Sequence, residues 1–430
     1  MCIRDRTDTV MVGMLGETSL SATALANQFV NIYQICCMGI AMGASVLTSR
    51  FWGMQDITSL KKTITLMLRL CIVLAVLFML PTILIPQLLM RMYTNDSAVI
   101  AQGVQYFKWM VYCYFLQGMT MTCTIVLRSV GQVNFPLFTS IGSFFVNILF
   151  NYMFIFGKLG VPRMEVEGAG VGTLIARVFE FSLICGYFLF VDRKIGYRLK
   201  DLRMKCNSLI KDYVSISIPV FVSDSLLALG TSAVAMVMGR IGTGFVSANS
   251  ITVVTQQLTT VVIQGICHAS CIMTGHTLGH GEREKAQQQA WTFLILGLVV
   301  GILGGGLIKV LSRSIIGLYN ITPETAQIAG ELMDAIAFIV IFQSMNSILT
   351  KGVLRGGGDT KFLMVADIIF LWAASLPLGI LAGLVWHLDA FWIYVFLKID
   401  QICKSIWCVF RLRSGKWIKT FSKEKMNHAK

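Results

Sequence analysis

The chain has 430 residues, of which only 13% are charged while 55% are hydrophobic. A soluble protein carries about 25% charged residues, so this chain has too few polar side chains to cover a water-facing surface. The mean hydropathy of +0.71 and the recurrence of apolar runs long enough to cross a bilayer predict an all-α polytopic membrane protein. They exclude a disordered chain, a disulfide-rich secreted module and an ordinary cytosolic enzyme.

The net charge of +14 does not indicate a nucleic-acid partner, because most Lys and Arg residues fall in short loops and in the tail. Loops that remain in the cytoplasm carry such an excess. The basic loop at residues 191–212 and the basic tail at residues 411–430 therefore predict that both termini are cytoplasmic. The 12 Cys residues are scattered through apolar segments without a CxxC pair, so we expect no metal site and no disulfide framework.

Apolar runs separated by Gly, Pro and charged residues predict eleven membrane-spanning helices, preceded by a short stub. The stub covers residues 8–15, and the spans of the first half cover residues 20–48, 63–89, 102–127, 135–156 and 168–190. The spans of the second half cover residues 213–238, 246–274, 290–311, 331–354, 362–385 and 391–410. The predicted domains are an N-terminal lobe at residues 7–190, a cytoplasmic linker at 191–212, a C-terminal lobe at 213–410 and a tail at 411–430.

The two halves repeat each other at an offset of about 226 residues. MVGMLG from Met11 recurs as VMGRIG from Val237, and LRSVGQ from Leu127 recurs as LRGGGD from Leu354. Six spans per half let both halves enter the membrane in the same direction. The sequence therefore predicts two six-helix bundles related by a pseudo-twofold axis along the membrane normal.

The same offset predicts that the first helix is truncated. Span seven begins near residue 213, so its counterpart would begin before Met1. Residues 1–6, MCIRDR, would also place two Arg and one Asp inside the membrane, at ~2.5–3.5 kcal/mol each. We expect these six residues to be foreign to the natural protein, and the chain to be less stable than a version extended upstream.

Three features together resemble the MATE family of multidrug and toxic-compound efflux transporters. They are DTVMVGMLG from Asp8, ASVLTSRFWG from Ala44, and the LRSVGQ/LRGGGDT pair. The resemblance implies a twelve-helix fold, alternating access, and export of small amphipathic or cationic compounds against Na⁺ or H⁺. It also implies no cofactor besides the coupling ion. A membrane enzyme would need a catalytic set within the spans, and the sequence has no paired His/Asp motif, nucleophile elbow or HExxH, so we expect no enzyme activity. We expect a monomer in the bilayer of a bacterial cytoplasmic membrane.

Ionisable side chains within spans are functional candidates, because a charge in hydrocarbon is costly. The resemblance implies that Asp8 is the first-helix carboxylate that binds a proton or a cation. In the DinF-like branch an Asn and an Asp on span five lie near that carboxylate. Here those positions hold Asn147 and Asn151, so an amide replaces the acid. Thr173 matches the sixth-span Thr of that branch, and a packing face of small residues is the alternative role.

NorM-like members instead carry carboxylates on spans seven and ten, but this chain has Ser344 at the span-ten position. Asp224 on span seven and Asp367 on span eleven are candidates for a polar site in the C-terminal lobe, or for side chains satisfied by their neighbours. Arg177 and Glu180 lie three residues apart on one helix face. They predict an ion pair, either structural or proton-coupled.

Polar and aromatic residues on spans two and eight predict the wall of a substrate cavity. These residues are Gln28, Asn31, Tyr33, Gln34, Gln256 and Gln257. The alternative function is a flippase for lipid-linked sugars, whose cavity would need Arg and Lys to hold pyrophosphate. Arg69 and Arg177 are the only Arg residues that we place inside the spans, which counts against this alternative.

Overall fold

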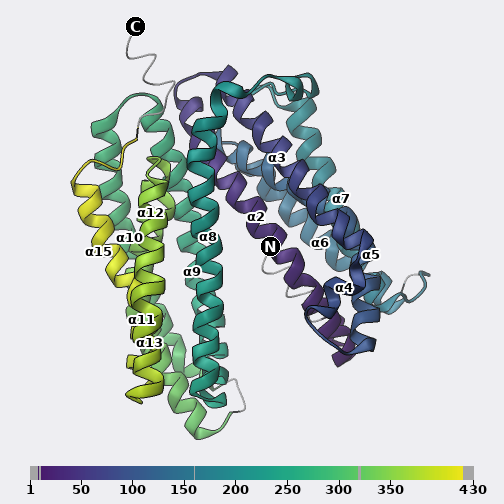
Figure 1. The fold of residues 1–430 in the computed structure, drawn as a ribbon, viewed down its shortest axis with the longest axis vertical. Coiled ribbons are helices and arrows are strands. Elements are labelled where there is room, and N and C mark those ends of the chain that lie inside the picture. Colours follow the sequence, from purple (N-terminus) through teal and green to yellow (C-terminus); the bar gives the residue numbers. More distant parts are fainter. Residues whose placement is uncertain (1–7, 9–10, 159, 318–320, 420–430) are drawn as a thin grey trace. The chain divides into compact units, whose positions relative to one another are not determined.

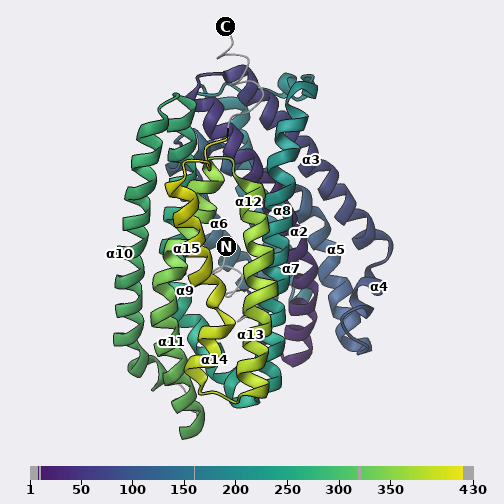
Figure 2. The same ribbon diagram turned by 60° about the vertical axis from the view of Figure 1, so that its left-hand side comes forward.

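The computed structural model of the chain describes residue 8 and residues 11–158, 160–317 and 321–419. The described residues form helices and contain no strand, and the long helices appear as coiled ribbons in Figures 1 and 2. The prediction that residues 1–6 are foreign lies outside the described residues. Two compact units divide the chain: unit 1 holds the described residues up to Thr48 and Ile57–Tyr213, and unit 2 holds Ser49–Asp56 and the described residues from Val214.

Unit 1 is a bundle in which α5 packs against α3 and α7, and α7 packs against α6. Its elements are α2 (Glu17–Gly53), α3 (Ile57–Leu84), α4 (Pro86–Arg91), α5 (Ser97–Ser129), α6 (Asn134–Phe156), α7 (Glu165–Gly186), the π-helical η1 (Tyr187–Val191) and the 3₁₀-helical η2 (Leu199–Arg203). Tyr33, Phe107 and Tyr114 are among the buried residues of its apolar core. The core thus joins α2 to α5.

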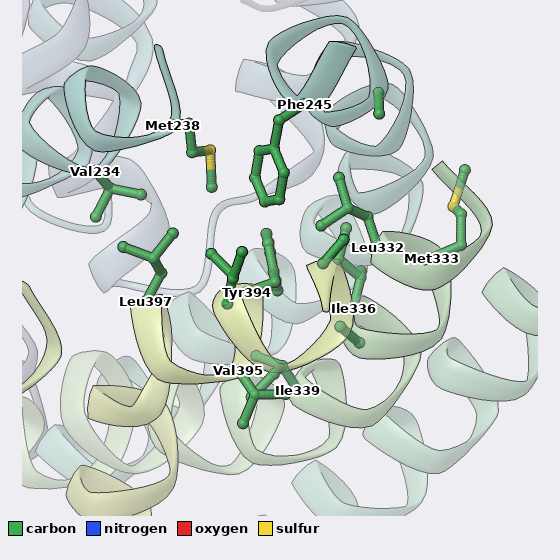
Figure 3. Packing of buried hydrophobic residues seen from close by; sticks show 14 of the residues in the cluster. Val234, Met238, Phe245, Leu332, Met333, Ile336, Ile339, Tyr394, Val395 and Leu397 are labelled. Atoms are coloured by element: carbon green, nitrogen blue, oxygen red, sulfur yellow. The ribbon is translucent and has the colours of Figure 1, made fainter. Parts of the chain in front are cut away.

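Unit 2 is organised around α11, which contacts α9, α10, α14 and α15. Its elements are α8 (Asn207–Ile241, beginning in unit 1), α9 (Thr243–Gly279), α10 (Arg283–Ile316), α11 (Pro323–Ser347), η3 (Ile348–Leu354), α12 (Thr360–Asp367), η4 (Ile368–Ser375), α13 (Leu376–Ile380), η5 (Leu381–Val385), α14 (Ala390–Leu397) and α15 (Ile399–Arg413). In Figure 3, Leu332 and Ile336 of α11 lie on the side of Tyr394 of α14, while Leu397 of α14 lies below Val234 of α8. Burial of these apolar side chains fixes α14 against α8 and α11.

Ten helices of the described chain are long and apolar enough to cross a membrane, by length and composition. The prediction of an unbroken span at residues 391–410 is wrong. The backbone leaves the helical region at Lys398 (φ −124°, ψ 15°), so two shorter helices, α14 and α15, replace it. Figure 2 shows them following one another along the bundle. The predicted span at 63–89 also ends early, because Ile85 is non-helical and Pro86 starts α4.

The predicted duplication is visible in the helices themselves. α2 and α9, α3 and α10, α5 and α11, and α6 and α12 each begin 226 residues apart. The last residues of the LRSVGQ and LRGGGD motifs, Gln132 and Asp359, each form a side-chain hydrogen bond to a residue near the end of their own half of the chain. Gln132 Nε2 donates a hydrogen bond to Asp192 Oδ1 at 2.8 Å, and Asp359 Oδ2 accepts one from Arg411 Nε at 2.7 Å. In both units this position anchors the chain near the end of the repeat.

The basic loop after α7 folds onto α3. Lys61 Nζ donates to Asp201 Oδ2 at 2.9 Å, and the backbone N–H of Arg198 donates to the same oxygen at 3.0 Å. Although burial by itself raises the pKa of Asp201, these two contacts hold that pKa below its usual value. Burial raises the pKa of Tyr197 to about 12, and its hydroxyl lies 2.9 Å from Thr65 Oγ1. The loop is therefore an ordered part of unit 1.

Residues 411–419, which we call the C-terminal strap, close one end of unit 2. Trp417 is 0% exposed, lies against Gly357, and donates from Nε1 to Gln287 Oε1 at 2.8 Å. The carbonyl of Lys419 accepts from Arg50 Nη1 at 2.6 Å, and its N–H donates to the carbonyl of Gly357. The strap thus ties the end of α2 to the loop between η3 and α12.

We expect Trp417→Ala to destabilise the protein by about 3–5 kcal/mol, because it removes a fully buried indole and leaves a cavity. The measurement is the midpoint of thermal unfolding of purified protein in detergent. Trp392→Ala is the matched control, since Trp392 is half exposed. Equal midpoints for the two variants would show that the strap does not stabilise unit 2.

Candidate functional sites

The structure brings Asp8 and Asn151 together in unit 1. Asn151 Nδ2 donates to Asp8 Oδ1 at 2.6 Å, and Asp8 is half-buried. Asn147 lies one helical turn before Asn151 on α6, is 0% exposed, and has no hydrogen-bond partner for either side-chain atom. Asn151 Oδ1 is also buried without a partner. One carboxylate and three amide atoms without hydrogen-bond partners therefore lie on, or against, the same face of α6. We call Asp8, Asn147 and Asn151 the unit 1 site.

The sequence places these groups through the periodicity of α6. Its buried residues are, in chain order, Pro136, Thr139, Ser143, Asn147, Asn151 and Ile155. Residues four apart share a helix face, so this stripe faces the bundle while the remaining faces are apolar. Gly172 of α7 packs against it: a Cβ at Gly172 would overlap Asn151 Oδ1 and would lie 2.9 Å from the Asn151 backbone nitrogen. Thr173, the next residue, is buried.

Arg177 and Glu180 form the ion pair that the sequence predicts. Arg177 Nη1 lies 3.1 Å from Glu180 Oε2, and both side chains are largely buried. Both residues lie on α7, which also carries Thr173. The pair neutralises two charges inside unit 1, while Arg177 Nε stays buried without a partner.

In unit 2, Asp224 and Asp367 belong to two neighbouring ion pairs rather than to one shared carboxylate site. Arg355, which is 4% exposed, donates from Nη2 to Asp224 Oδ1 at 3.0 Å and from Nη1 to Asp224 Oδ2 at 3.5 Å. Ser223, next to Asp224 on α8, donates to Asp367 Oδ2. Removing one partner of a buried ion pair costs about 3–5 kcal/mol. The pair of Arg355 and Asp224 therefore holds α8 firmly against the end of η3.

Asp367 also contacts Lys404, whose Nζ lies 2.9 Å from Asp367 Oδ1 and 3.1 Å from Asp400 Oδ2. The polar contacts continue from Asp400 through two amide side chains. Gln401 Nε2 donates to Asp400 Oδ2, and Asn346 Nδ2 donates to Gln401 Oε1. We call these side chains, together with Ser223, Asp224 and Arg355, the unit 2 network. It joins α8, α11, α12 and α15, and no group of three or more His, Cys, Asp and Glu in the described chain is arranged to hold a metal ion.

Sequence reasoning missed the basic members of this network. The expectation that Arg69 and Arg177 are the only Arg residues within the spans overlooks Arg355, which lies one residue beyond the predicted span at 331–354. Arg355 is buried, while Arg69 is exposed and donates to the carbonyl of Leu202. Lys404 carried a clear signal, because it follows Asp400 by one helical turn within an apolar segment, where an ionisable residue is a functional candidate.

The predicted cavity residues separate into different environments. Gln28 and Asn31 are exposed and Gln34 is half-buried, in keeping with one face of α2. The prediction that Tyr33 belongs with them is contradicted: it is 0% exposed, lies in the apolar core, and donates to the carbonyl of Tyr114 at 2.5 Å. Its position on the helix points it away from that face.

On α9 of unit 2, Gln256 and Gln257 are both half-buried. Gln256 Nε2 donates to Gln343 Oε1 of α11 at 2.7 Å. Both residues lie in unit 2, and Gln256 forms a polar contact between α9 and α11. A role in contacting substrate stays a prediction for both residues.

Comparisons with known proteins agree with this fold. A family model described as MatE matches residues 3–153 and 219–402. YisQ of Bacillus subtilis, an uncharacterized transporter, is 24% identical over 419 residues, which cover 96% of this chain and 90% of YisQ. NorM of Thermotoga maritima, a probable multidrug resistance protein, is 24% identical over 418 residues, with coverages of 96% and 88%.

Among solved structures, the Vibrio cholerae MATE transporter VcmN in its bent form superposes with a TM-score of 0.86 at 17% identity. The match covers 96% of this chain and 92% of that one. At this identity the likeness concerns the fold alone. It supports the all-helical architecture that the sequence predicts.

We expect Gly172→Val to displace Asn151 and to weaken its hydrogen bond to Asp8, because the new side chain needs space that α6 occupies. Overpacking of this kind costs about 1–3 kcal/mol, measured as a lower midpoint of thermal unfolding. Gly186→Val on the same helix is the control, since no atom lies within 4 Å of a Cβ at Gly186. Equal stability of the two variants would contradict the close packing of α6 and α7.

Proposed function

Because the chain belongs to the MatE family of membrane transporters, we propose that it is a secondary active exporter of small amphipathic or cationic compounds. It exchanges them for Na⁺ or H⁺ by alternating access in a bacterial cytoplasmic membrane. The basic loop and tail support cytoplasmic termini, and we propose that the protein acts as a monomer. The relative from Thermotoga maritima, a probable multidrug resistance protein, supports a broad substrate range.

The observation that carries the coupling proposal is the hydrogen bond between Asn151 and Asp8. A carboxylate inside a membrane protein exchanges a proton or binds a cation more readily than it stays charged and alone. The unpaired oxygens of Asn147 and Asn151 are neutral ligands that suit a hard cation such as Na⁺. They equally suit a protonated Asp8, whose hydroxyl would need an acceptor.

The unit 1 site contains one acidic side chain, because amides stand where a second acid would stand. A site with one negative charge is neutralised by one proton or by one Na⁺. We therefore propose that unit 1 takes up a single monovalent charge in each cycle. The ion-bound and ion-free states of the unit 1 site would then differ by one charge. An ion gradient shifts the equilibrium between these two states.

A flippase for lipid-linked sugars is a second candidate, which Arg355 and Lys404 favour more than the sequence suggested. Each of these cations is nevertheless paired with carboxylates inside unit 2. A pyrophosphate would have to compete with those carboxylates for the positive charge. Transport of an organic cation, compared with that of a lipid-linked pyrophosphate in the same vesicles, decides between the two functions.

We expect Asp8→Asn to abolish gradient-driven efflux while leaving expression and equilibrium binding of the organic cation intact. An amide keeps the size and the hydrogen-bonding capacity of the side chain but neither releases a proton nor balances a cation. The measurement is efflux of a fluorescent organic cation from proteoliposomes, under a Na⁺ gradient and a proton gradient separately. The gradient that drives wild-type efflux identifies the coupling ion.

Asp224→Asn is the comparison for this experiment, because Asp224 is an acidic residue of unit 2 that already has a partner in Arg355. Its expected effect is a loss of stability with coupling retained in the protein that folds. Efflux at the wild-type rate in Asp8→Asn would remove Asp8 from the mechanism. Loss of coupling in Asp224→Asn alone would assign that role to unit 2.

A further inference from the structure

Lys404 occupies the centre of a buried row of charges in unit 2. Its side chain is 2% exposed, and its ammonium lies 2.9 Å from Asp367 and 3.1 Å from Asp400. The two carboxylates come from different helices, α12 and α15, while Lys404 and Asp400 are one helical turn apart on α15. One monovalent cation thus bridges two anionic side chains that would otherwise repel each other.

Both carboxylates have polar contacts besides the ammonium. Asp367 accepts a further hydrogen bond from Ser223, and Asp400 Oδ2 accepts one from Gln401 Nε2 at 2.6 Å. Asp400 is 2% exposed, yet its Oδ1 has no hydrogen-bond partner. Asp400 Oδ1 is therefore an oxygen ligand that the ammonium does not use.

Other cations nearby do not replace Lys404. Arg355 interacts electrostatically with Asp367, but both of its hydrogen bonds go to the oxygens of Asp224. Lys398 interacts electrostatically with Asp400 but is half-buried at the junction between α14 and α15. Without Lys404, the space between Asp367 and Asp400 would hold two carboxylates with no cation between them, which a low-dielectric interior disfavours strongly.

We propose that Lys404 is a tethered cation that fills a monovalent-cation site formed by Asp367 and Asp400. Lys404 offsets one of the two carboxylate charges without an ion from solution, and removing the ammonium opens a latent site that takes Na⁺. An ammonium and Na⁺ carry the same charge, and carboxylate and hydroxyl oxygens suit both. The role of Asp8 in coupling does not enter, because the latent site lies wholly within unit 2.

The test measures thermal unfolding of Lys404→Ala in detergent while NaCl replaces choline chloride at constant ionic strength. A ligand that binds only the folded state raises the unfolding midpoint as its concentration increases. We expect a rise of about 2–4 °C between about 1 and about 300 mM NaCl for Lys404→Ala. The wild-type midpoint should not change, because the site is already filled.

The double variant Asp367→Asn/Lys404→Ala is the matched control, since it removes one of the two carboxylates. Its midpoint should lose the dependence on Na⁺ and should lie above that of Lys404→Ala in choline chloride. A midpoint of Lys404→Ala that is independent of Na⁺ overturns the proposal. So does an equal dependence in the wild type or in the double variant.

Lys404→Gln keeps the proposal testable where Lys404→Ala yields no folded protein. Glutamine is neutral but still donates a hydrogen bond to one carboxylate, so it preserves more of the packing. Binding of radioactive sodium ion to this variant should exceed binding to the wild type by about one ion per chain. Binding equal to that of the wild type would show that Lys404 forms only a structural ion pair.

Discussion

Hydrocarbon does not solvate charge, and this constraint decides where the polar groups of this protein lie. On α6 and on α15 most buried residues recur every four positions, and the polar members of each stripe face the bundle. Asn151 reaches Asp8 from one stripe, and Lys404 reaches Asp367 from the other. Each interaction joins residues that lie far apart in the sequence. The packing of the helices and the pairing of their buried polar groups therefore depend on each other.

The two units share an origin but satisfy this constraint differently. Their helices begin at a common offset, yet unit 1 presents a carboxylate beside amides with unpaired atoms, whereas unit 2 pairs its acids with Arg355 and Lys404. A group with unsatisfied partners readily changes its ionic state. Acids that are already paired with buried cations resist such a change, so the asymmetry supports a division of roles between the units.

The repeated motif shows how a duplicated sequence acquires two outcomes. Arg128 and Arg355 occupy matching positions, but only Arg355 meets an acid, because Asp224 lies on a neighbouring helix. The end of the motif keeps its role in both halves, where Gln132 and Asp359 each anchor the end of the repeat. Local sequence was preserved, and the neighbouring helices determined its use.

The sequence by itself determined the class, the order of the spans and the duplication, because helix length, apolar composition and periodicity are local properties. It also determined the pair of Arg177 and Glu180, since residues three apart on a helix are neighbours. Only the tertiary structure decided that Tyr33 belongs to the core and that Lys404 bridges Asp367 and Asp400. Those contacts depend on which faces of distant helices meet, and packing fixes this after the helices have formed.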